Sequence, residues 1–106
     1  MLRQVWKPHA PTRPAIGTVG LTKKVVIVDG IGFGTGGAMI EVNGMALAKS
    51  RVNTDLTLAD GTAAELLAKL GKADINQTFV RGVPVTVTVY NPATGERSEP
   101  FTFTRK

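Results

Sequence analysis

A glycine-rich stretch comes closest to a chemical motif in this sequence. Gly32, Gly34 and Gly37 match the spacing G-x-G-x-x-G directly after the β-branched run at residues 25–28, as the glycines of a dinucleotide-binding loop do. That loop needs a helix at its end, whose N-terminal amides hold the pyrophosphate. Residues 39–44, which follow, are instead typical of a strand and a tight turn. We therefore predict a structural loop and no bound cofactor.

Side chains that could catalyse a reaction or bind a metal are dispersed. His9 is the single histidine and lies between prolines, and there is no cysteine, which excludes disulfides, thiolate nucleophiles and zinc-thiolate sites. The aspartates lack the spacing of a calcium loop. Glu96 and Glu99 fall in a predicted surface hairpin, where no cavity would shift their proton affinity. We expect no catalytic site, no metal site and no enzymatic activity.

Aromatic side chains could bind carbohydrate, because such sites use exposed aromatic faces. We assign Phe33, Phe101 and Phe103 to the core. Trp6 and Tyr90 then remain as candidate interaction residues. Trp6 is expected to contact the fold or a neighbouring domain, as aromatic residues often do at interfaces. A carbohydrate ligand stays open as the alternative.

The chain has 13 Lys and Arg against 8 Asp and Glu, a net charge of +5. Such an excess can attract nucleic acid or anionic surfaces. The basic residues occur singly or in pairs, without the run that marks a nucleic-acid arm. The pattern favours scattered, solvated charges and no nucleic-acid partner, with an anion-binding patch as the alternative.

Alternating patterns predict β-strands along most of the chain. Residues 23–29 are β-branched enough for a buried strand. Residues 39–49 read as a hairpin around Asn43-Gly44, a dipeptide that favours a type I′ turn. Residues 83–90 and 101–104 alternate apolar residues with threonine or other residues, as strands with one face on a core do. Several such strands separated by turn signals predict an all-β, immunoglobulin-like two-sheet sandwich.

One segment follows a helical period instead. Residues 63, 66, 67 and 70 are apolar, Thr62 with Glu65 fits a capping box, and Gly71 supplies a stop. We therefore expect a short helix over residues 62–70. Its leucines would dock on the sheet, because so short a helix is marginal alone in water.

The chain divides into a Pro-rich linker and a single domain. Residues 1–13 contain closely spaced prolines that stiffen the chain, and residues 14–106 form the domain. No apolar run approaches the ~20 residues of a membrane span, so no membrane insertion is expected.

Five segments, taken in order, carry a family resemblance. They are Pro14-Ala15-Ile16, Val28-Asp29-Gly30-Ile31-Gly32-Phe33-Gly34, Val42-Asn43-Gly44, Val87-Thr88-Val89-Tyr90-Asn91-Pro92 and Ser98-Glu99-Pro100-Phe101-Thr102-Phe103-Thr104. Together they resemble the IPT/TIG domain family, immunoglobulin-like modules of plexins, Rel-type transcription factors and many bacterial surface and secreted proteins. The resemblance covers residues 13–105 and departs from the family at residues 60–74.

The resemblance implies a structural signature and a role. The signature residues are Gly30, Gly32, Phe33, Gly44, Asn91, Pro92, Phe101 and Phe103. The implied role is that of a non-catalytic spacer or protein-interaction module in a larger bacterial protein, at the cell surface, in the periplasm or secreted. Its partners would be neighbouring domains or another protein. The alternative is a ligand-binding module, for carbohydrate first and nucleic acid second.

Overall fold

The computed structural model describes residues 13–34, 37–53, 55–59 and 62–106. Within these ranges the regular elements are all strands except for one short helix. The elements are β1 (Ala15–Leu21), β2 (Val25–Ile31), β3 (Met39–Val42), β4 (Met45–Ala46), β5 (Ser50–Val52), β6 (Glu65–Lys69), α1 (Lys72–Thr78), β7 (Pro84–Asn91), β8 (Glu96–Arg97) and β9 (Phe101–Thr104).

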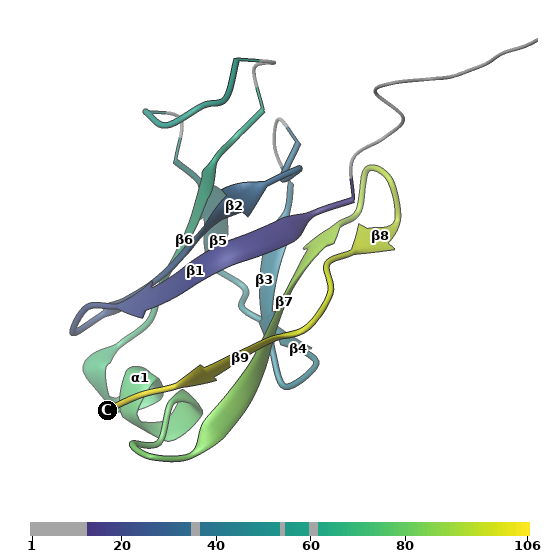
Figure 1. Cartoon of the computed structure of the whole chain (residues 1–106). Coiled ribbons are helices and arrows are strands. Elements are labelled where there is room, and N and C mark those ends of the chain that lie inside the picture. Colours follow the sequence, from purple (N-terminus) through teal and green to yellow (C-terminus); the bar gives the residue numbers. More distant parts are fainter. Residues whose placement is uncertain (1–12, 35–36, 54, 60–61) are drawn as a thin grey trace, which may run out of the picture.

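The strands form two antiparallel sheets packed face to face (Figure 1). One sheet has the order β1-β2-β6-β5, and the other has the order β4-β3-β7, with β8 and β9 both paired to β7. This is the strand order of an immunoglobulin constant-type sandwich, with one additional short strand, β4, on the edge of the second sheet. The predicted all-β sandwich is confirmed.

The core lies between the two sheets and follows the predicted alternation of β7. Val85, Val87 and Val89 are buried, while the threonines between them are exposed or half-buried. Phe33 and Phe79 are the largest fully buried side chains. The signature residues Phe101 and Phe103 are half-buried, and the Phe103 ring meets Phe79 edge-on at 5.8 Å between centroids.

The predicted turn at Asn43-Gly44 joins β3 to β4. Both residues have positive φ, 50° and 83°, as a type I′ turn requires. The returning strand ends at Ala46, earlier than the expected residue 49, because the chain then crosses to the other sheet. Ser50 fixes this crossing: its hydroxyl accepts a hydrogen bond from the Ile40 amide at 2.9 Å and donates to the Leu47 carbonyl at 2.7 Å.

The helix predicted over residues 62–70 is wrong. Glu65–Lys69 form β6, an inner strand between β2 and β5. Leu66 and Ala68 enter the core fully buried, whereas Leu67 lies on the other face beside Ile27. Pairing on both sides and burial of alternate residues outweigh a local helical pattern.

The helix of this region is instead α1, beyond the predicted stop. Gly71 is its N-cap residue in extended conformation, and Ile75 anchors it in the core. Glu65 was expected to cap a helix. Its carboxylate instead accepts a hydrogen bond from the side-chain nitrogen of Asn53, Nδ2, at 2.8 Å. The segment therefore supplies a strand and then a helix where the sequence predicted only the helix.

Two of the signature residues allow close backbone approach beside β1. A Cβ at Gly30 would lie 2.0 Å from the Ala15 carbonyl oxygen, and Gly32 has a φ of 76°. Asn91 is buried, and its side-chain oxygen accepts a hydrogen bond from the Ala93 amide at 3.0 Å. Pro92, which follows it, is exposed. These residues shape the loops that carry the chain between the sheets.

Candidate functional site

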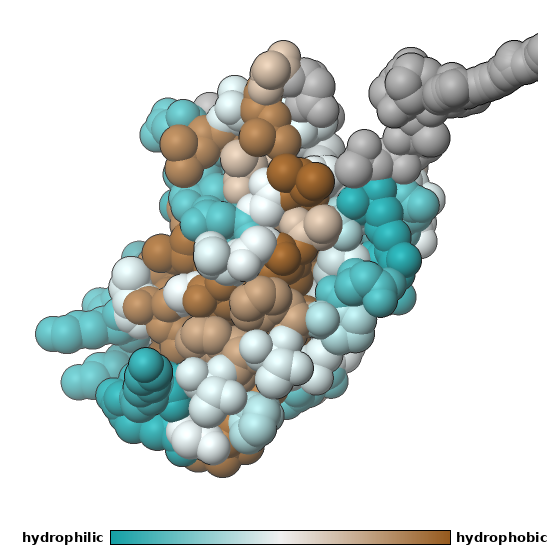
Figure 2. All heavy atoms as spheres, viewed as in Figure 1, coloured by the Kyte–Doolittle hydropathy of each residue, from teal (hydrophilic) through white to brown (hydrophobic). Residues whose placement is uncertain are grey.

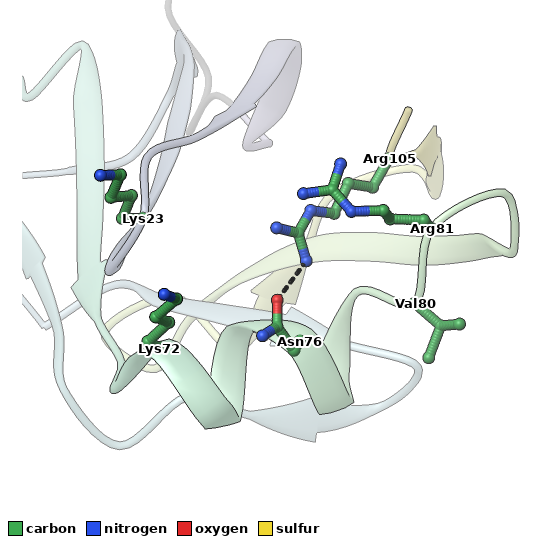
Figure 3. A pocket seen from close by; sticks show the side chains of 6 residues that line it. All are labelled: Lys23, Lys72, Asn76, Val80, Arg81 and Arg105. Atoms are coloured by element: carbon green, nitrogen blue, oxygen red, sulfur yellow. Dashed lines mark hydrogen bonds between the residues drawn. The ribbon is translucent and has the colours of Figure 1, made fainter.

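A cavity of about 520 Å³ opens at the end of the sandwich where α1 and the last residues of the chain lie (Figure 3). It is lined by Lys23, Lys72, Asn76, Val80, Arg81 and Arg105. We call this cavity the cationic pocket, since four of the six lining residues carry a positive charge. Figure 2 shows hydrophilic side chains gathered at this end of the molecule, at the lower left.

Local structure fixes the lysine side of the pocket. Thr22 closes the β1–β2 turn: its hydroxyl accepts hydrogen bonds from the amides of Lys24 at 3.3 Å and Val25 at 3.0 Å. Lys23 therefore stands at the tip of a defined turn. Lys72 is four residues before Asn76 on α1, a spacing that brings two side chains to the same face of a helix.

The arginine side of the pocket is held by hydrogen bonds. Arg105 Nη1 donates to Asn76 Oδ1 at 2.8 Å and to the Phe79 carbonyl at 3.2 Å. Arg81 Nη1 donates to the main-chain oxygen of Lys106 at 2.5 Å. These contacts use one nitrogen of each guanidinium, and a guanidinium has five N–H donors in a rigid fork. Both arginines thus keep donors for a ligand.

Among the residues that the structure describes, the cations that line the pocket form no ion pair. None of the residues found to line it is acidic. The ion pairs in the described part of the chain join Arg13 to Glu99 at 2.7 Å and Arg97 to Glu41 at 2.6 Å, and neither includes a pocket residue. Clefts lined by one sign of charge concentrate ions of the opposite sign. The arrangement can bind an anion.

The predicted interaction residues lie away from this pocket or outside the described residues. Trp6 falls in the undescribed residues 1–12. Tyr90 is half-buried on the outer face of β7, with the Arg97 guanidinium carbon 4.6 Å above its ring centre. One face of the Tyr90 ring is therefore occupied by a cation, and an unobstructed aromatic platform is not formed there.

Arg97 also holds Glu41, the most buried carboxylate among the described residues. Glu41 is 7% exposed and accepts hydrogen bonds from Arg97 Nε at 2.6 Å, Arg97 Nη2 at 3.1 Å and the Thr88 hydroxyl at 2.9 Å. These charge-assisted bonds outweigh the effect of burial and lower the pKa of Glu41 below its ordinary value. The ion pair also raises the pKa of Arg97. This cluster is satisfied within itself and stabilises the second sheet.

A second carboxylate is perturbed in the opposite direction. Glu65 lies directly opposite Asp29 across the β2–β6 pair. The hydrogen bond with Asp29 and the like charge raise the pKa of Glu65, against the lowering effect of the Asn53 hydrogen bond. The Thr18 hydroxyl donates a hydrogen bond to Asp29 Oδ2 at 3.3 Å. Within the described ranges no group of three His, Cys, Asp or Glu residues could hold a metal ion.

The glycine motif leads into a strand. Residues 35 and 36 lie outside the described ranges, and the chain after them forms β3, as the sequence predicted. Gly34 instead approaches Asn91, whose side-chain nitrogen would lie 2.9 Å from a Cβ at position 34. The glycines therefore serve loop packing.

Sequence reasoning missed the cationic pocket, because its cations are far apart in the sequence, with Lys23 and Arg105 separated by 82 positions. They reach it from a turn, a helix, a loop and the end of β9. The one local signal is the spacing of Lys72 and Asn76. It has meaning only on α1, a helix that the sequence did not predict.

Comparison with protein-family models, curated proteins and solved structures found no match to this chain. In the described residues, no helix has the length and apolar character that crossing a membrane requires.

Proposed function

We propose that this chain is a non-catalytic, immunoglobulin-like docking module that binds an anionic partner in the cationic pocket. The observation that carries the proposal is the convergence of Lys23, Lys72, Arg81 and Arg105 on one cavity without an acidic neighbour among the lining residues found. Charges that are only solvated need not lie around one cavity, so their convergence favours a binding role. The groups present donate hydrogen bonds and neutralise charge, which suits binding.

The module is proposed to be of the IPT/TIG kind and to belong to a larger bacterial protein outside the cytoplasm. Support comes from the five sequence segments in family order and from an immunoglobulin strand order that accommodates them. The docked partner would be a neighbouring domain, another protein or an anionic ligand.

A role as a spacer is the second candidate, favoured by the placement of the chain ends. The described domain begins at one end of the sandwich and finishes at the opposite end, beside α1 (Figure 1). A domain entered and left at opposite ends adds its own length to a row of domains. Docking and spacing are compatible, because the cationic pocket then lies close to where a following domain would start.

An experiment with inorganic sulfate tests the docking site. In a 15N-labelled sample, sulfate is titrated against chloride at equal ionic strength while backbone and arginine side-chain resonances are followed by NMR. We expect saturable, sulfate-specific shifts confined to residues of the cationic pocket. Shifts that are equal in chloride, or that spread over basic residues everywhere, would refute the proposal.

Matched variants complete this test. Lys23→Gln with Arg81→Gln removes two exposed charges from the pocket, whereas Arg51→Gln with Lys69→Gln removes two exposed charges elsewhere. Both double variants have the same net charge. Only the pocket variant should lose the sulfate response, and thermal unfolding verifies that both remain folded.

A further inference from the structure

A second cavity extends the cationic pocket along the same end of the sandwich. It has a volume of about 470 Å³ and shares Lys23, Arg81 and Arg105 with the first. The remaining residues that line it are Gly20, Leu21, Thr22, Phe103, Thr104 and Lys106. We call the two cavities together the cationic groove. It runs from α1 past the β1–β2 turn to the end of β9.

The groove has cations on both sides. Figure 3 shows Lys23 and Lys72 on one side of the first cavity and Arg81 and Arg105 on the other. Lys106 adds a fifth cationic side chain in the second cavity, while its main-chain oxygen accepts the hydrogen bond from Arg81. None of the residues found to line either cavity is acidic. A single small anion cannot contact five cations that are distributed over two cavities, whereas a chain with repeated negative charges can.

We infer that the cationic groove binds a linear polysaccharide that carries carboxylates, a polyuronate. This inference rests on the proposed docking function and names its ligand class. Guanidinium forks match the two oxygens of a carboxylate, and Arg81 and Arg105 keep free donors beyond their internal hydrogen bonds. Between the cations, Thr22, Thr104 and Asn76 offer hydroxyl and amide groups that can exchange hydrogen bonds with sugar hydroxyls.

Two other anionic polymers fit the groove less well. A nucleic acid strand would need exposed aromatic rings for its bases to stack on, and the one aromatic residue found in the lining, Phe103, is half-buried against Phe79. An acidic peptide must lose the freedom of a flexible backbone on binding, and apolar anchors would normally offset that cost. The groove offers Val80 as its one exposed large apolar side chain. The pyranose rings of a polyuronate are rigid, so it loses less conformational freedom than a peptide for each carboxylate that it brings to the groove.

The test compares polymers of matched shape. Polygalacturonate, its fully methyl-esterified and therefore uncharged form, and monomeric galacturonate are titrated by calorimetry into the complete chain. We expect polygalacturonate to bind saturably and more tightly per uronate than the monomer, and the ester to show no binding. The affinity should fall by about tenfold or more in Lys23→Gln/Arg81→Gln, as the loss of two charge-assisted contacts predicts. It should stay near the original value in Arg51→Gln/Lys69→Gln.

Other polymers and the monomer define the outcomes that overturn the inference. Tighter binding of poly-glutamate or of random-sequence duplex DNA than of polygalacturonate at equal salt would overturn it, and so would polygalacturonate that binds no better per uronate than the monomer. If sulfate still shifts the pocket resonances in such a case, the docking site stands and only the ligand class falls. If sulfate gives no specific shift either, both proposals fall.

Discussion

Close contact at Gly30 makes the first two strands sensitive to a single methyl group. A Cβ at this position would lie 2.0 Å from the Ala15 carbonyl oxygen and 2.9 Å from the Phe33 ring. Both neighbours are constrained, because β1 pairs with β2 here and Phe33 is fully buried. The sequence marked Gly30 and Phe33 as signature residues, and the structure supplies the contact that links them.

We expect Gly30→Ala to destabilise the fold by about 1–3 kcal/mol or more, as overpacking does. Gly20→Ala is the matched control on the neighbouring strand, where a Cβ would meet no atom within 4 Å. Its effect should stay within about 0.5 kcal/mol, because the added methyl group neither overpacks the structure nor breaks a contact. Urea unfolding of the two variants measures the difference, and equal stabilities would contradict the described contact.

The Glu41–Arg97 pair predicts a pH dependence of stability. Because the folded protein lowers the pKa of Glu41 through the Arg97 hydrogen bonds, this carboxylate stabilises the fold above its unfolded pKa of about 4.3. That contribution is lost as the pH falls through the lowered folded value. Arg97 is half exposed, with 53% of its side chain accessible, so solvent screening moderates the effect.

Glu41→Gln should therefore lower the melting temperature most above about pH 5, with a deficit that shrinks as the pH falls below about 4. Glu65, whose pKa shifts in the opposite direction, is present in both proteins and cancels in the comparison. Thermal unfolding of wild type and variant across this range is the measurement. A deficit that is constant with pH would show that the ionised pair contributes nothing specific.

At the scale of elements, the local pattern of residues 62–70 predicts a helix, whereas pairing with other strands makes part of this segment the strand β6. The hairpin around Asn43 and Gly44 and the alternation in β7 were predictable, because turn chemistry and a period of two are local properties. Leu66 and Leu67 are compatible with two structures. Both can lie on the apolar stripe of a helix, or they can lie on opposite faces of a strand. The choice between them depends on β2 and β5, which lie on either side of β6 and are distant in sequence.

A pair of leucine substitutions tests this assignment. Leu66 is fully buried between the sheets, so Leu66→Ala should cost about 2–5 kcal/mol. Leu67, half-buried on the outer face of the same sheet, should cost clearly less when it is changed to alanine. A helix would place both leucines on one apolar stripe. Similar losses for the two variants in chemical unfolding would favour the helix over β6.

At the scale of the whole molecule, a net charge of +5 says little about where the charge acts. The sequence favoured scattered, solvated charges, and only the folded chain brings Lys23, Lys72, Arg81 and Arg105 around one cavity. The sandwich was predictable because strands such as β3 and β7 carry their own alternation. The cationic pocket was not, because it depends on how the β1–β2 turn, α1 and the end of β9 meet.

This charge distribution predicts weak, unspecific binding of duplex DNA. Sequence reading needs an element that enters a groove and side chains that converge on base edges, and the cations of the groove instead lie around a cavity at the end of a sandwich. Attraction then comes from a few phosphate contacts, so affinity should fall by about tenfold or more between about 50 and 200 mM salt. Fluorescence anisotropy with several random duplexes at both concentrations measures this. Submicromolar binding that persists at the higher concentration, or a clear preference among sequences, would make nucleic acid the partner, because counterion release alone cannot produce either result.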